Sequence, residues 1–204
     1  MKLHLVLLAA GQSKRFKAIK QLASVHGKPL INHTLDNYQQ DGKLLRGINK
    51  LSLVLGANAQ KIRPVLPSDL AIFYAADWQQ GMGSSIAFAV SQLGSDVSHV
   101  CIALADQLAL TRQDMQLLLD KSTEQPEKII AAYYQDSVGA PAIFPRRYFP
   151  ELESLVGDKG AKVILQRHPE SLVPLALPHA RIDIDTADDL QSWLRSNSPL
   201  STML

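Results

Sequence analysis

The feature that most constrains this chain is an apolar run over residues 3–10 that stops abruptly at Gly11. A run this apolar is typical of a strand buried on both faces, as in a parallel sheet covered by helices. Small residues follow, and Gly11 can adopt a positive φ without steric cost. Cations then follow directly, namely Lys14, Arg15, Lys17 and Lys20. A turn that presents successive backbone N–H groups beside such cations is suited to a polyphosphate.

The loop matches neither of the common phosphate-binding motifs. A Walker loop ends in Gly-Lys-Ser/Thr, which is missing here, and a dinucleotide fingerprint needs two further glycines. An ordinary strand-to-helix turn with a solvated basic face is therefore the alternative to a phosphate loop.

Further along the chain, apolar runs alternate with amphipathic segments, which predicts a parallel sheet with helices on both faces. Strands are expected at 51–56, 71–74, 100–105, 128–134, 140–144 and 182–185, with an edge strand at 172–175. Helices are expected from 29 to about 41, over 57–65, after 81, from 111, in patches between 145 and 168, and from 186. A turn is expected at 136–139, and Thr111 and Thr186 each predict a capping box.

Composition limits the class of protein. With 204 residues, 46% of them hydrophobic, the chain can close one core, so we expect one domain over 1–195 and a flexible tail over 196–204. A net charge of +2 argues against nucleic acid or a membrane surface as partner. The single cysteine, Cys101, excludes a disulfide framework and fits a cytoplasmic location.

Two carboxylates follow apolar runs, as expected of residues at the carboxyl edge of an open α/β sheet, where ligands bind. Asp106 follows the run 100–105, and Asp185 ends the run 182–185. A few hard oxygen ligands beside a phosphate loop suit Mg²⁺, which shares its coordination with substrate phosphates. Alternatively, Asp106 caps a turn and Asp185 belongs to a helix start, and Asp183 competes with Asp185 for the metal.

A set of short motifs resembles a known family. These are 8–15 with Lys20, the Gly-Met-Gly-Ser-Ser block 81–85, 104–107, Gly139-x-Pro141, 157–161 and 183–186. They are similar, in this order, to the nucleotidyltransferases that complete molybdenum cofactor. The match is closer to the cytidylyltransferases than to the guanylyltransferases, because the latter usually have a second glycine at Ala10 and lack the 81–85 block.

The resemblance implies a three-layer Rossmann-like fold of the nucleotide-diphospho-sugar transferase type with a mostly parallel sheet. It also implies an Mg²⁺-dependent transferase that moves CMP from CTP to molybdopterin and releases pyrophosphate. The same chemistry with GTP, or with a different acceptor such as a sugar phosphate, is the first alternative. A target molybdoenzyme is a further partner that it implies. A non-catalytic module that carries molybdenum cofactor is the alternative from another class of protein.

The resemblance also assigns roles to individual residues. Arg15 would neutralise the leaving pyrophosphate, Lys20 would lie against the attacked phosphate, and Asp106 and Asp185 would hold the metal. The nucleotide would contact Ala9, Ala10, Gly11, Gln12, Ser13, Gly81, Gly83, Ser84 and Ser85. The acceptor pocket would be bordered by Gly139, Pro141, Gly157, Asp158 and Gly160. The chain departs from the family at Lys17, where glycine is usual, and at Leu108, where proline is common.

Overall fold

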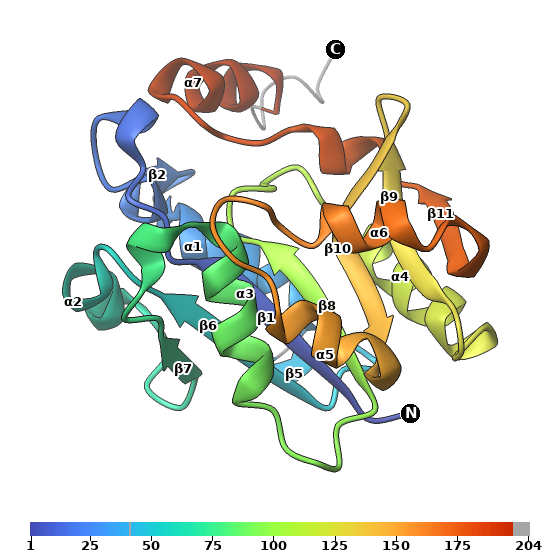
Figure 1. Ribbon diagram of the computed structural model, residues 1–204. Coiled ribbons are helices and arrows are strands. Elements are labelled where there is room, and N and C mark those ends of the chain that lie inside the picture. Colours follow the sequence, from blue (N-terminus) through green and yellow to red (C-terminus); the bar gives the residue numbers. More distant parts are fainter. Residues whose placement is uncertain (41, 198–204) are drawn as a thin grey trace.

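The computed structural model describes residues 1–40 and 42–197, and Figure 1 shows a central sheet flanked by helices. Seven strands run in the order β11-β9-β10-β8-β1-β6-β7. They are β1 (Leu3–Ala9), β6 (Lys50–Leu55), β7 (Ala71–Tyr74), β8 (His99–Leu104), β9 (Ile129–Tyr134), β10 (Ser137–Pro145) and β11 (Leu172–Ala176). Only β10 runs antiparallel to its neighbours within this sheet. The mostly parallel sheet predicted from the sequence is therefore confirmed.

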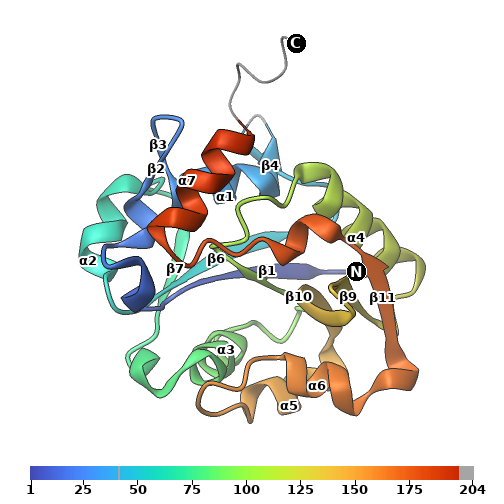
Figure 2. The ribbon, with the colours of Figure 1, turned by 90° about the horizontal axis from the view of Figure 1, so that it is seen from above.

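Helices cover both faces of the sheet, as Figure 2 shows from above. One face packs against α1 (Leu30–Leu35), α2 (Ala59–Ile62) and α4 (Arg112–Glu124), and the other against α3 (Met82–Ser91), α5 (Phe149–Glu153) and α6 (Lys162–Arg167). Residues in β1 alternate between the two cores: Leu5 and Leu7 enter the first, whereas Val6 and Leu8 enter the second. This double burial explains why β1 is apolar at nearly every position.

Most of the expected elements are present, and the exceptions have local causes. The first helix ends at Leu35 and continues as a 3₁₀ turn and the short strand β4 (Gln39–Gln40), which pairs with β5 (Lys43–Leu44). The hairpin between β9 and β10 turns at Gln135 and Asp136, which both have positive φ, so β10 already includes Ser137 to Gly139. β11 is an edge strand, as predicted.

The predicted strand at 182–185 is wrong, because this segment pairs with no strand of the described chain. It runs in irregular extended form to α7 (Ala187–Ser196), whose capping box on Thr186 is confirmed, as is that of Thr111 on α4. Most of the expected tail lies outside the described residues.

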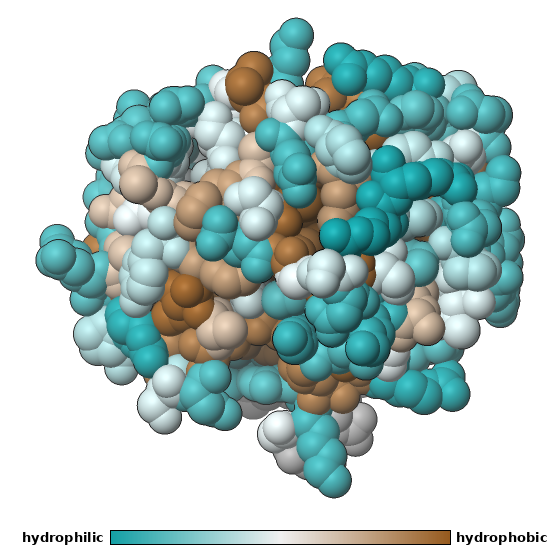
Figure 3. Space-filling view, turned by 60° about the horizontal axis from the view of Figure 1, so that its bottom comes forward, coloured by the Kyte–Doolittle hydropathy of each residue, from teal (hydrophilic) through white to brown (hydrophobic). Residues whose placement is uncertain are grey.

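Hydrophilic residues cover most of the face that Figure 3 shows, with apolar side chains visible between them. None of the helices within residues 1–40 and 42–197 has the length and apolar character needed to cross a membrane. A two-stranded ribbon, β2 (Ser24–Val25) and β3 (Lys28–Pro29), follows the basic loop and leads into α1.

Candidate functional site

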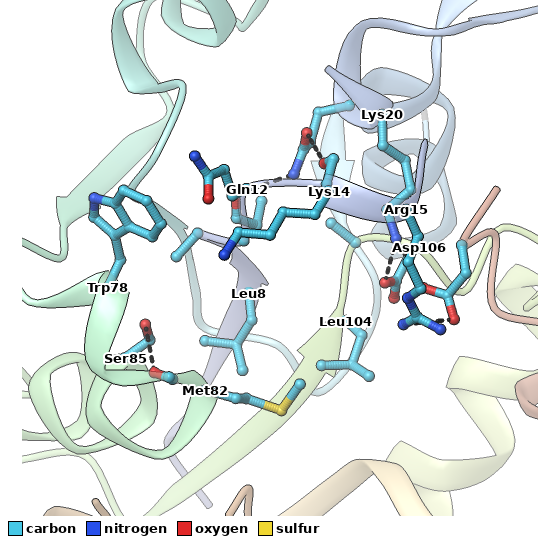
Figure 4. Close-up of a pocket in the computed structure, with 18 of the residues that line it drawn as sticks. Leu8, Gln12, Lys14, Arg15, Lys20, Trp78, Met82, Ser85, Leu104 and Asp106 are labelled. Atoms are coloured by element: carbon cyan, nitrogen blue, oxygen red, sulfur yellow. Dashed lines mark hydrogen bonds and ion pairs between the residues drawn. The ribbon is translucent and has the colours of Figure 1, made fainter. Parts of the chain in front are cut away.

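A cavity of about 470 Å³ opens at the carboxyl ends of β1 and β8 (Figure 4). Its floor is formed by residues at these strand ends, Leu8, Ala9, Leu104, Ala105 and Asp106. The basic loop, residues 10–15, lies on one side of the cavity and Lys20 beside it, while Trp78, Gly81 and Met82 lie on another side. Figure 4 shows Lys14 extending from the loop toward the side that carries Trp78. The structure thus brings the loop and the Asp106 carboxylate into one cavity.

The basic loop is held by its own turns and by one buried amide. Ser13 and Lys17 have φ values of 58° and 59°, and Phe16 N–H donates to the Ser13 carbonyl at 3.0 Å. The Gln21 side chain accepts from the Ser13 hydroxyl at 3.2 Å and donates to the Ala9 carbonyl at 3.3 Å. Gln21 was not singled out from the sequence, where only its place beside Lys20 could have drawn attention to it.

The departure from the family motif at Lys17 now has a structural setting. Lys17 has the left-handed backbone that favours glycine, which explains why glycine is usual there. Gly11, in contrast, does not have a positive φ, and nothing lies within 4 Å of where a Cβ would be placed. The left-handed positions in this loop are therefore Ser13 and Lys17.

Four charged groups from three distant segments meet at one end of the cavity. Lys20 Nζ lies 2.8 Å from Asp106 Oδ2 and 3.5 Å from Asp185 Oδ1, and Arg15 Nη2 lies 3.0 Å from Asp185 Oδ2. Lys20 is 8% exposed, so its charge is mostly shielded from water and its attraction to both carboxylates is strong. Asp106 Oδ1 is buried and has no hydrogen-bond partner in the described part of the chain.

Asp183 has a different environment from Asp185. Partial loss of hydration, together with the negative charges of Asp106 and Asp185, raises the pKa of Asp183 to about 7. No ion pair of Asp183 is formed within residues 1–40 and 42–197. The structure therefore places Asp185, rather than Asp183, on Arg15 and Lys20.

An apolar cluster lies behind these charges. Phe16, Leu108 and Ile184 are buried in it, each one or two residues from Arg15, Asp106 or Asp185. Leu190 of α7 is buried in the same cluster, and Trp193 packs against it. Leu108 is 1% exposed, so in place of the family's common proline this chain has a side chain that joins the segments of the charged end.

The glycine block at the start of α3 packs tightly against the later loop 156–160. Gly81 has a φ of 113°, and Gly83 N–H donates to the Gly157 carbonyl at 2.8 Å. A Cβ on Gly83 would lie 2.5 Å from the Lys159 carbonyl oxygen, and one on Gly160 would lie 2.9 Å from Met82 Sδ. These glycines allow two main chains to approach each other, which fixes the wall of the cavity that carries Met82.

The other residues predicted to contact the nucleotide or the acceptor differ in whether they line the cavity. Gly81, Ser85 and Asp158 line the cavity. The residues that do not line it are Gly83, Ser84, Gly139, Pro141, Gly157 and Gly160. Ser84 Oγ accepts from the Gly157 N–H at 3.3 Å, and Gly139 and Pro141 lie at an irregularity in the pairing of β10 with β9.

Comparison with known proteins identifies the family. The model of the MobA-like NTP transferase domain matches residues 5–172. The chain belongs to this family. The nucleotidyltransferase class expected from the motifs is thereby confirmed, and so is the resemblance, at the level of MobA-like NTP transferases.

Three similar proteins show how far the similarity extends in sequence and in fold. Nicotine blue oxidoreductase from Paenarthrobacter nicotinovorans is 30% identical in an alignment of 203 residues that covers 93% of this chain and 95% of that protein. The crystal structure of Rv0371c from Mycobacterium tuberculosis has a TM-score of 0.78 at 26% identity and covers 96% of this chain and 99% of its own. The same protein has also been solved in complex with manganese. Molybdopterin-guanine dinucleotide biosynthesis protein A from Archaeoglobus fulgidus shares the fold, with a TM-score of 0.66 at 17% identity, over 98% of this chain and 100% of its own.

Proposed function

We propose that this NTP transferase moves CMP from CTP to the terminal phosphate of molybdenum cofactor and releases pyrophosphate. The observation that carries nucleotidyl transfer is the meeting of Arg15, Lys20, Asp106 and Asp185 beside the basic loop. Transfer of this kind depends on positioning and on charge stabilisation rather than on covalent help from the protein. The choice of CTP and of molybdopterin rests on the motif blocks described above.

The residues present fit a divalent metal ion. Asp106 and Asp185 approach the same ammonium group, and Asp106 Oδ1 has an unused, buried acceptor position. No three His, Cys, Asp or Glu side chains of the described residues are grouped to hold a metal alone. Two carboxylates are nevertheless enough for Mg²⁺, which keeps waters and takes phosphate oxygens as ligands. When bound, the metal supplies positive charge that reduces repulsion between the reacting phosphates. The manganese complex of Rv0371c supports a divalent ion in this proposal.

The chain's own groups then have distinct roles. Backbone N–H groups of residues 10–13 hold the triphosphate, and Arg15 neutralises the leaving pyrophosphate. Lys20, fixed between Asp106 and Asp185, lies against the attacked phosphate. The acceptor phosphate is already an anionic nucleophile, so the reaction needs cations that hold two anions in line more than it needs a strong base.

The other side of the cavity supplies a surface for rings. Trp78 and Met82 present aromatic and thioether groups that can pack on a base or a pterin. Asp158 contributes a carboxylate to the lining of the cavity, which can accept hydrogen bonds from ring amino groups.

The test is incubation of the protein with molybdenum cofactor, Mg²⁺ and each nucleoside triphosphate in turn, followed by mass analysis of the products. We expect a cytosine dinucleotide and stoichiometric pyrophosphate with CTP, and no product from Asp106→Asn. A guanine dinucleotide formed with GTP would show that the donor is GTP, and the assignment as a nucleotidyltransferase would stand. Product limited to one equivalent per protein would favour the carrier alternative. Oxidation or reduction of nicotine blue in a parallel assay, without any dinucleotide product from CTP or GTP, would overturn the proposal in favour of the activity named for the Paenarthrobacter relative.

A further inference from the structure

Gln107, the residue after Asp106, is fully buried and makes two hydrogen bonds with one amide group. Its Nε2 donates to the carbonyl oxygens of Ala140 at 2.9 Å and of Ala180 at 2.8 Å. These two bonds use both N–H groups of the carboxamide. Both partners are carbonyl oxygens, which would repel the amide oxygen. The amide group can therefore be placed in only one orientation, with its nitrogen toward the two carbonyls.

The two carbonyls belong to distant segments that border the site. Ala140 lies between Gly139 and Pro141, at the irregularity in β10. Ala180 lies in the 3₁₀ helix Pro178–Arg181, which leads directly to the segment 182–185. Ile184 N–H also donates to the Asp106 carbonyl at 3.1 Å. Asp106 and Gln107 therefore hold the segment that carries Asp185 at two points.

Gln107 has a cost as well as a benefit for stability. Its Oε1 is buried and has no hydrogen-bond partner among residues 1–40 and 42–197, and such a group costs free energy. An apolar side chain of the same length would avoid that cost, but it would leave the carbonyls of Ala140 and Ala180 without the donor that they have here. The amide is therefore the group that joins both segments to the turn after Asp106.

We propose that Gln107 is a positioning residue that sets the separation of Asp106 and Asp185, and hence the place of Lys20 between them. It does so by joining the turn after β8 to the β10 irregularity and to the 3₁₀ helix before Asp185. This inference rests on the proposed function, since it concerns the same carboxylates. Partners behind metal-binding groups commonly change metal affinity or activity 10- to 100-fold when they are replaced.

The test compares Gln107→Met with Asn32→Leu. Asn32 is a matched control, because its Nδ2 also donates to a carbonyl, that of Val65 at 2.7 Å, and its buried Oδ1 also has no partner in the described chain. We expect Gln107→Met to lower turnover roughly 10- to 100-fold and to weaken Mn²⁺ binding, measured by calorimetry with CTP present, by about tenfold. Asn32→Leu should leave both within about twofold of the wild type while its thermal stability changes to a similar extent.

A second variant protects the test against failure to fold. Gln107→Asn keeps the amide group on a side chain shorter by one methylene, which we expect to reach only one of the two carbonyls. Its turnover and its Mn²⁺ affinity should therefore lie between those of the wild type and those of Gln107→Met. Wild-type Mn²⁺ affinity and turnover in Gln107→Met, or a larger loss in Gln107→Asn than in Gln107→Met, would overturn the inference. An inactive wild type would overturn the proposed function instead, and Mn²⁺ calorimetry on the same variants would then decide the role of Gln107.

Discussion

The two ends of the cavity are built by opposite means. At the charged end, Arg15, Lys20, Asp106 and Asp185 come from segments far apart in the sequence, and side chains make the contacts. At the glycine end, the start of α3 meets the loop 156–160 through main-chain atoms, and the absence of side chains makes the contact possible. A residue can therefore shape a site in two ways, either by the chemical group that it carries or by having no side chain where two main chains meet.

Mutations at the two ends should also have different effects on the protein. The charged end is backed by the apolar cluster of Phe16, Leu108 and Ile184, so a lost charge should leave the fold in place. At the glycine end a mutation should instead destabilise the fold, because an added methyl group would displace main-chain carbonyls. Chemistry and stability should therefore be separable by mutation.

The largest effect is expected at the charged end. Lys20→Ala and Asp106→Ala should each raise the barrier by about 3–4 kcal/mol, since each removes a group that stabilises charge in the reaction. Steady-state turnover checks this, with circular dichroism to show that the fold is retained. Lys28→Ala is the control, because Lys28 pairs with Asp36 outside the cavity and its loss should leave turnover unchanged. Near-normal turnover in either site variant would contradict the roles assigned here.

The next effect separates the two ends directly. Gly83→Ala should lower the free energy of unfolding by about 2 kcal/mol, because its Cβ would lie 2.5 Å from the Lys159 carbonyl oxygen. Gly11→Ala should change it by less than about 0.5 kcal/mol, since nothing lies within 4 Å, yet its methyl group should weaken nucleotide binding in the loop. Urea unfolding and nucleotide titration measure the two quantities. Equal destabilisation by both variants would remove the distinction.

A third effect tests whether stability can change without touching either end. His4 Nε2 lies 2.9 Å from Ser52 Oγ in the sheet, and burial, aided by the charge of Lys50, lowers the pKa of His4 to about 4. The folded protein thus binds this proton less readily than the unfolded chain, whose histidine pKa is about 6.5. The folded state is therefore fully stable with respect to this group above pH 6.5, and about 3 kcal/mol of stability is lost as the pH falls toward 4.

Urea unfolding between pH 4 and 7 measures this loss, and His4→Gln should make the pH slope shallower while keeping turnover at pH 7. Some slope will remain, because burial also lowers the pKa of His33. Parallel slopes in the wild type and His4→Gln would show that another group is responsible.

The smallest effect concerns backbone strain beside the charged end. Lys17→Gly should raise the free energy of unfolding by about 0.5–1 kcal/mol, because its φ of 59° costs a side-chain-bearing residue but not glycine. Lys14→Gly, in the same loop but without a positive φ, should lower it by a similar amount. Thermal or urea unfolding of the pair decides the point, and a change of the same sign in both would exclude strain as the cause.

Much of the fold could be predicted, because burial on both faces leaves a strong local pattern. The apolar runs in β1, β6 and β8 predict a covered parallel sheet, and the capping boxes at Thr111 and Thr186 are complete within four residues. The segment 182–185 has the sequence pattern of a strand without being one, because Ile182 and Ile184 are apolar at a spacing of two. These two side chains pack in the apolar cluster behind the charged end and not on a sheet.

The local sequence therefore specifies the loop after β1, the alternation of strands and helices, and the residue types available for phosphate chemistry. Only packing of the whole chain brings Lys20 between Asp106 and Asp185, places Leu108 in one cluster with Phe16, and lets Gln107 join three segments. The physical reason is the distance along the chain over which each kind of interaction acts. Backbone preferences and hydrophobic periodicity act over a few residues, whereas ion pairs and buried amide bonds between distant segments exist only once the chain has packed.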